Sequence, residues 1–139
     1  MKNETITIML CEGKAVNQHA EHEISPVQIV FPVKAGPSEA YMKLLGCTKL
    51  ERDTVKIHGA TYTLYFDKDN RKHDELIATY PVWDKEGKIY DVIAGSVLIA
   101  KEDGEHHTLD IPKDEQPFIA EHLDKQTELA GMAVIFGKV

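Results

Sequence analysis

The sequence predicts an α+β fold built mainly on an antiparallel sheet, in a single domain covering residues 1–139. Three observations indicate this class. Segments with the two-residue period of strands outnumber segments with helical periodicity. Most of these segments are joined by short turn sequences rather than by helices, which disfavours a doubly wound sheet. The chain of 139 residues, 42% hydrophobic and 28% charged, has the size and composition of one globular domain.

The first part of the chain predicts two strands. Residues 5–10 alternate threonine with isoleucine before ending in Met-Leu, which is the period of a strand. Residues 12–23 are polar and we expect a loop there. Residues 27–33 predict the second strand, and Pro32 near its end indicates an edge position because proline donates no hydrogen bond to a neighbouring strand.

A first helix is predicted over residues 37–45. Pro37 suits the first helical position, and Glu39 is favoured by the positive end of the helix dipole. Gly46 is suited to end the helix in the left-handed conformation. The apolar face of this helix consists of Tyr41, Leu44 and Leu45.

The middle of the chain predicts further strands. Residues 55–58 and 61–66 flank His58-Gly59-Ala60 and indicate a hairpin. Residues 76–83 return to strand character. Residues 89–100 contain the most apolar stretch of the chain, and continuous apolarity is typical of a strand covered on both faces.

The last part of the chain predicts a short strand, a second helix and a final strand. The strand covers residues 106–109 after the tight-turn pair Asp103-Gly104. The helix covers residues 114–128, because Pro112 and Pro117 are compatible only with its first turn. Residues 132–136 are apolar and are expected to form a last strand or a segment packed against the body.

The net charge of −7 belongs to one stretch of the chain. Residues 102–128 contain nine acidic and two basic residues, whereas the remainder contains fourteen of each. Such an asymmetry concerns the electrostatic field and the binding partners rather than the fold. Direct binding of double-stranded nucleic acid by this stretch is disfavoured, since that binding depends on lysine and arginine neutralising phosphates.

The acidic stretch predicts a surface for a basic partner protein. Electrostatic attraction would speed up association and make it sensitive to salt. The alternative is a face that only keeps the protein soluble. The residues that would form the surface are Glu102, Asp103, Glu105, Asp114, Glu115, Glu121, Asp124 and Glu128.

A second interpretation is a small-molecule site for a nucleotide. Aromatic rings can stack on a heterocycle, and arginine or lysine can bind a phosphate group. The residues that would form this site are Tyr62, Tyr80 and Trp83 for the ring and Arg71 and Lys72 for the phosphate. The chain contains no glycine-rich phosphate-binding motif and no nucleophile-elbow motif.

A third interpretation is a metal-dependent hydrolase built on His19 and His22. Two imidazoles three residues apart can share an ion if the segment is helical. A catalytic zinc also needs a further ligand and an activating carboxylate, and the sequence has no HExxH spacing. A surface loop is therefore favoured, and we expect neither a metal nor another cofactor.

The compartment follows from three features of the chain. Cys11 and Cys47 are the only cysteines and neither lies at metal-ligand spacing from another, so reduced thiols are expected. No apolar run approaches the roughly 20 residues of a membrane-spanning helix. The first residues lack the apolar core of a signal peptide. The sequence therefore predicts a cytoplasmic protein.

In the middle of the chain, Asn70 and Arg71 are followed by a strand of the form Asp-x-Ile-x-Gly at Asp91, Ile93 and Gly95. Through these residues the chain resembles a family of small uncharacterised domains from bacteriophages and mobile elements. The resemblance implies a β-rich α+β domain and a phage or prophage accessory role, and it implies no chemistry.

Together these observations favour a non-enzymatic interaction protein that binds a basic host or phage protein. The nucleotide-binding module and the metal hydrolase remain alternatives. One sequence leaves the oligomeric state open, although short strands and Pro32 indicate free sheet edges.

Overall fold

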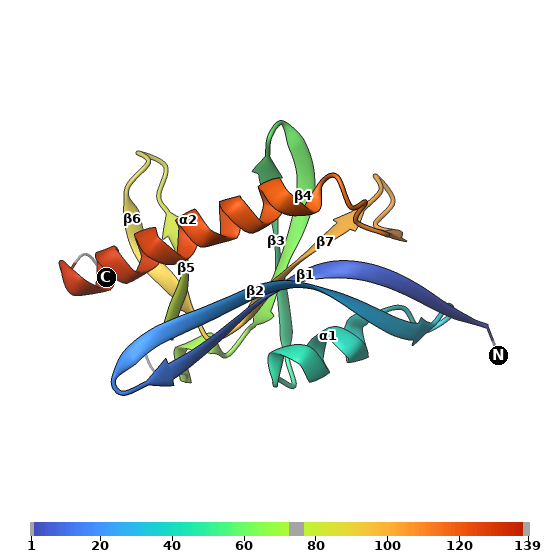
Figure 1. Cartoon of the computed structure of the whole chain (residues 1–139), viewed down its shortest axis with the longest axis horizontal. Helices are drawn as coiled ribbons and strands as arrows, with labels where there is room; N and C mark the ends of the chain where they lie inside the picture. The colour runs from blue at the N-terminus through green and yellow to red at the C-terminus, as the bar shows by residue number, and fades with distance from the viewer. Residues whose placement is uncertain (1, 73–76, 138–139) are drawn as a thin grey trace.

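The computed structural model describes residues 2–72 and 77–137 of the chain (Figure 1). Its elements follow in the order β1 (Asn3–Val16), β2 (His19–Pro32), α1 (Ser38–Leu45), β3 (Leu50–Ile57), β4 (Ala60–Asp67), the 3-10 helix η1 (Asn70–Lys72), β5 (Ala78–Trp83), β6 (Ile89–Ala94), β7 (Val97–Glu102), β8 (Thr108–Leu109) and α2 (Gln116–Ile135).

The strands form one large and one small antiparallel sheet. The large sheet has the order β2-β1-β7-β4-β3, and β8 pairs with β7. The small sheet is the pair β5–β6. The predicted α+β class, with a mainly antiparallel sheet and two helices, is confirmed.

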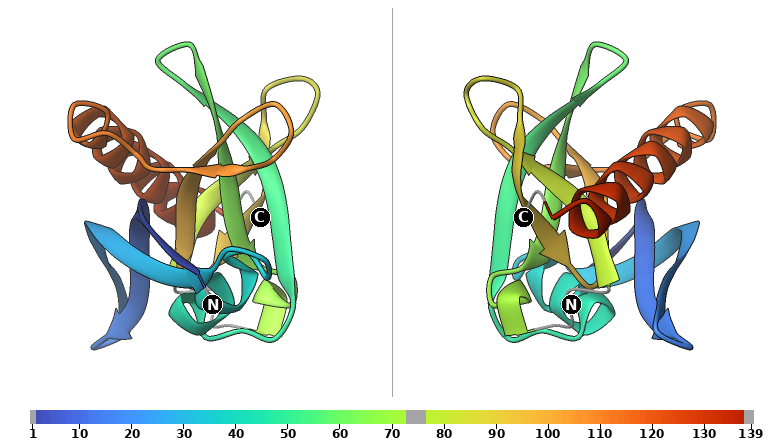
Figure 2. Two further views of the ribbon diagram at one scale, coloured as in Figure 1. Left: turned by 90° about the vertical axis from the view of Figure 1, so that its right-hand side faces the viewer. Right: turned by 90° about the vertical axis from the view of Figure 1, so that its left-hand side faces the viewer.

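Each face of the large sheet is covered by a helix. Successive side chains of a strand point to opposite faces, so β1 contributes to two cores. Ile8 packs in the cluster that contains Tyr41 of α1, whereas Met9 packs in the cluster that contains Leu123 of α2. Figures 1 and 2 show α2 and α1 on opposite sides of the strands. Residues Tyr80 and Ile93 place the small sheet in the α2 cluster.

The strand β7 lies at the centre and is apolar on both faces. Its residues 97–100 have 0% exposure, as expected for a strand covered twice. The single strand predicted over residues 89–100 is nevertheless wrong. Gly95 has a φ of 90°, which breaks the run into β6 and β7, and these strands belong to different sheets. Apolar periodicity alone does not reveal where a continuous apolar run bends.

The loop predicted over residues 12–23 is also wrong, because these residues complete a long β1–β2 hairpin. Val16 pairs with His19, and the two turn residues, Asn17 and Gln18, have φ values of 50° and 67°. Positive φ at both central residues is the geometry of a type I′ hairpin turn. One face of the outer part of this hairpin carries exposed polar side chains, and the other carries only Gly13, Ala15, Ala20 and the half-buried His22, so no large apolar face marks it as a strand.

The second helix is longer than the predicted range of 114–128. Of the two alternatives for residues 132–136, the last strand is wrong, whereas a segment packed against the body is observed. The helix α2 continues to Ile135. Its buried residues keep helical spacing to the end, since Ala130 and Ala133 pack against Ala78 and Val92 of the small sheet. An apolar run too short to show its period is equally compatible with a strand.

Other local predictions are confirmed. The helix α1 ends at Gly46, which has a φ of 66° and whose N–H bonds to carbonyl oxygens of the last turn. The hairpin β3–β4 turns at residues 58–59. Pro32 ends the edge strand β2. The predicted strand over 76–83 is observed as β5, and its first residue, Leu76, lies outside the described residues.

The two cysteines are free thiols, as expected. Cys11 is buried, and this burial raises the pKa of its thiol to about 12, so the thiol is protonated and unreactive at neutral pH. Among the described residues, neither helix combines the length and the apolar character that crossing a membrane requires.

Candidate functional site

A cavity lies between the C-terminal half of α2 and the β5–β6 turn. It has a volume of about 570 Å³, within the range of ligand pockets. Its walls are mostly apolar: Trp83 and Ile89 of the small sheet face Leu129, Met132 and Ala133 of α2 and Phe136 just after it, and the charged Lys88 also lines the cavity. We call this cavity the α2 groove.

Large apolar side chains of the α2 groove are open to solvent. Trp83 and Met132 are each 46% exposed, and Phe136 is 68% exposed. Ile135, the last residue of α2, is 77% exposed beside them in sequence. Clustered exposure of this kind marks an interaction site more often than scattered surface leucines do.

The turn between β5 and β6 fixes the sheet wall of the groove. The Asp84 carboxylate accepts the backbone N–H groups of Glu86 and Lys88, each at 2.9 Å, and Gly87 takes a φ of 78°. This closed turn holds Trp83 and Ile89 as neighbours across the two strands. The sheet wall is therefore set by turn chemistry.

Small residues fix the helix wall. Ala130 and Ala133 are 0% and 4% exposed against the small sheet. Because alanine has only a methyl group, the helix and the sheet approach closely at these positions. Met132, which lies between the two alanines in sequence, remains exposed at the groove.

A histidine–tyrosine pair lies next to the α2 groove, between α2 and β5. The Tyr80 hydroxyl and His122 Nε2 are 2.8 Å apart. Burial lowers the pKa of His122, so its imidazole is neutral at pH 7. A second half-buried histidine, His22 on β2, lies 3.0 Å from the Thr79 hydroxyl, and its partial burial lowers its pKa as well.

These two histidines predict a loss of stability on mild acidification. Both have folded-state pKa values below 6.5, so the unfolded chain binds protons more readily and stability falls as the pH drops below about 6.5. We expect a lower melting temperature at about pH 5.5 than at about pH 7.5. In the double variant His22→Gln, His122→Gln, the melting temperature should differ less between the two pH values. If the difference is as large as in the parent protein, these two histidines do not cause the loss of stability in acid.

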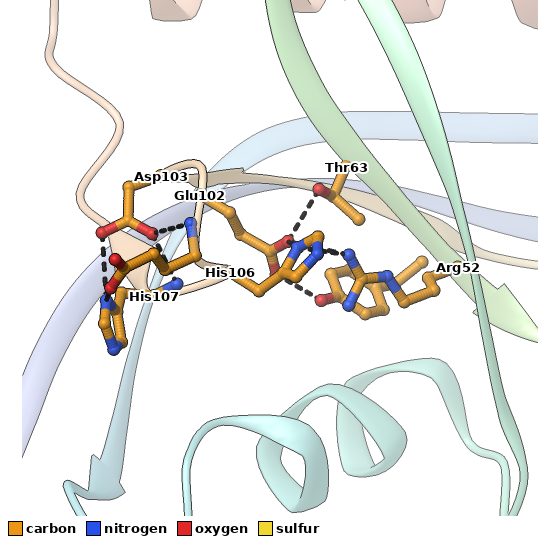
Figure 3. Close-up of polar contacts among 8 residues, drawn as sticks. Arg52, Thr63, Glu102, Asp103, His106 and His107 are labelled. Atoms are coloured by element: carbon orange, nitrogen blue, oxygen red, sulfur yellow. Dashed lines mark hydrogen bonds and ion pairs between the residues drawn. The ribbon is translucent and has the colours of Figure 1, made fainter.

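Two of the predicted acidic surface residues are internal partners. The Glu102 side chain is 6% exposed and accepts hydrogen bonds from the Thr63 hydroxyl at 2.9 Å and from the Tyr65 hydroxyl. Arg52 Nη2 lies 3.5 Å from the same carboxylate and donates to His106 Nδ1 at 2.7 Å. Figure 3 shows this cluster between β3, β4 and the turn after β7. The Glu102 carboxylate therefore binds neighbouring side chains of the protein and is not available on the predicted acidic surface.

Glu115 is the second acidic residue held internally. Lys101 Nζ donates to its two carboxylate oxygens at 2.9 and 2.8 Å, and the Tyr62 hydroxyl donates at 2.5 Å. The lysine and the tyrosine together lower the pKa of Glu115. These bonds tie the start of α2 to β7 and β4.

The other acidic residues of the stretch are exposed, and two of them shape the backbone. Asp103 accepts the N–H groups of Glu105 and His107 at 2.9 Å, and these bonds lower its pKa. Asp110 accepts the N–H of Thr7 at 2.6 Å. The remaining exposed carboxylates are those of Glu105, Asp114, Glu121, Asp124 and Glu128.

The structure brings together two of the five predicted nucleotide-site residues. Tyr80 and Trp83 line one cavity. Tyr62 is 1% exposed and its hydroxyl is held by Glu115, so its ring is not open to a ligand. Arg71 forms an ion pair with Asp91, and Lys72 is exposed in η1.

The two histidines of the metal interpretation lie on opposite faces of β2, because they are three residues apart on a strand. In the described ranges, 2–72 and 77–137, no group of three or more His, Cys, Asp or Glu side chains is placed to hold a metal ion.

Sequence reasoning missed the helix wall of the α2 groove. Leu129, Met132 and Phe136 were expected near or within a final strand. Their spacing of three and four residues continues that of Phe118, His122 and Lys125, and this longer repeat was the available signal.

Comparisons of the chain with protein-family models, with curated proteins and with solved structures find no match.

Proposed function

We propose that this chain is a non-enzymatic interaction module whose α2 groove binds a basic segment of a partner protein through apolar anchor residues. The observation that carries the proposal is the exposure of Trp83, Met132 and Phe136 around one apolar cavity. Aromatic residues and methionine are enriched at protein interfaces, where burying them supplies most of the binding energy.

The charge of α2 supports a basic partner. Its exposed carboxylates, Glu121, Asp124 and Glu128, outnumber the single exposed lysine, Lys125. Of these, Glu128 lies one helical turn before Met132 of the groove, and an acidic residue there attracts a positively charged segment and repels an acidic one. The phage-family resemblance implies an accessory role, and the sequence predicts a cytoplasmic protein. A basic host or phage protein fits both expectations as the partner.

The single tryptophan of the chain reports binding directly, because Trp83 lines the groove. Three probe peptides without aromatic residues, each about 18 residues or five helical turns long, would be titrated against the protein. One combines Leu and Lys in a helical pattern, the second Leu and Glu, and the third Ser and Lys. We expect only the Leu/Lys peptide to change the Trp83 emission, and to bind more weakly near 1 M salt, where the screening length is about 3 Å.

Two variants separate groove binding from general adhesion. Phe136→Ser should weaken binding of the Leu/Lys peptide about tenfold or more, as for a central interface residue. Val33→Ser is the matched control, since Val33 is 51% exposed away from the groove. Equal binding of the Leu/Glu peptide, or equal loss in both variants, would contradict the proposal.

A further inference from the structure

Two cavities adjoin each other on the flank of α2 that faces β3. The larger, about 310 Å³, lies between β3, β5 and α2. The smaller, about 150 Å³, lies between the end of β3 and the first turns of α2. Lys56 and His122 line both cavities, and we call the two adjoining cavities together the cleft. Figure 1 shows the β3–β4 tip rising beside the first half of α2.

The larger cavity combines aromatic rings with hydrogen-bonding groups. Trp83 is 46% exposed and supplies a ring open to a ligand, while Tyr80 is buried and lines the cavity. Asp53 and Gln126 supply a carboxylate acceptor and an amide. A planar heterocycle needs this combination, because its faces stack on aromatic rings while its edge exchanges hydrogen bonds. The volume lies at the lower end of the range of about 300–1,000 Å³ typical of small-molecule sites.

The smaller cavity is rich in cationic and imidazole groups. Lys56 and Lys125 line it together with His58, whose ring stacks on Phe118 with centroids 4.6 Å apart. Its one carboxylate, Glu121, lies 3.2 Å from Lys125 Nζ. Both members of this ion pair are more than 60% exposed, and such pairs contribute little, so Lys125 can turn to a stronger anion.

We infer that the cleft binds a nucleoside monophosphate, with its base against Trp83 and its phosphate between Lys56 and Lys125. The larger cavity contains the aromatic groups and the adjoining smaller cavity contains the lysines. A nucleotide needs both, because its base stacks on a ring and its phosphate pairs with a cation. The inference keeps the nucleotide class expected from sequence and replaces its phosphate-binding residues. Neither lysine lines the α2 groove, so the site is separate from the peptide site apart from the shared Trp83.

Trp83 emission and melting temperature test this site with defined probes. The adenosine, guanosine, cytidine and uridine monophosphates would each be compared with the matching nucleoside and with inorganic phosphate. At least one monophosphate is expected to quench Trp83 and to raise the melting temperature. It should bind about tenfold or more tightly than its nucleoside, since a hydrogen bond to a charged group contributes at least that factor.

Substitutions of three exposed lysines test where the phosphate group of the ligand binds. Lys56→Gln and Lys125→Gln should each weaken binding of the monophosphate about tenfold. Lys113→Gln removes the same charge from a different cavity and should change nothing. The inference is overturned if no monophosphate binds at millimolar concentration, if nucleoside or inorganic phosphate binds as tightly, or if the Lys113→Gln protein is weakened equally.

Discussion

Leu123→Ala is expected to destabilise the protein by about 2–5 kcal/mol, the range for removing a fully buried leucine side chain. Leu123 has 0% exposure and lies in the core between α2 and the large sheet. Truncation leaves a cavity there that rigid strands can fill only in part. Urea denaturation should show a lower midpoint with an unchanged slope.

Met132→Ala is the matched control on the same helix. Met132 is 46% exposed at the α2 groove, so its truncation should change stability by less than about 1 kcal/mol while weakening peptide binding. Leu123→Ala should lower stability strongly and leave peptide binding by the folded protein unchanged. If both variants lose the same stability, packing of Leu123 against the sheet is not what holds α2 in place.

Glu102→Ala is expected to destabilise the protein by about 1–3 kcal/mol although it removes an acidic residue from the most acidic stretch. Relief of charge repulsion would predict the opposite sign. The loss arises because the hydroxyls of Thr63 and Tyr65 lose their acceptor in a part-buried site. Burial and the Glu102 carboxylate raise the pKa of Tyr65, so its hydroxyl stays protonated and needs that acceptor.

Two further variants test this cause. Glu105→Ala removes an equal charge from a side chain that is 83% exposed, and it should change stability by less than about 0.5 kcal/mol. Tyr65→Phe in the Glu102→Ala background removes the stranded hydroxyl and should restore part of the loss. Equal effects of Glu102→Ala and Glu105→Ala would show that net charge alone matters.

The candidate site was predictable in part. Aromatic residues of the central strands indicated a ligand or partner surface, and Tyr80 and Trp83 do line the cleft beside α2. The cationic groups could not be placed, because Lys56 and Lys125 come together only when β3 and α2 pack on the same side. Arg71, nearer in sequence, is instead held by Asp91.

The sequence by itself determined the local elements whose signal lies within a few residues. The period of two in β4, the glycine that ends α1 and the turn between β3 and β4 are short-range properties of the chain. It also located the net charge in residues 102–128.

Only the tertiary structure decided which of those charges are free and where the cavities lie. Glu102 is hydrogen-bonded by side chains of strands far away in sequence, while Glu121 remains exposed on α2. The bend at Gly95 separates β6 from β7, and packing of α2 on the small sheet brings Trp83 and Phe136 to one groove. Burial and pairing depend on contacts between distant segments, and no local pattern of residue types contains that information.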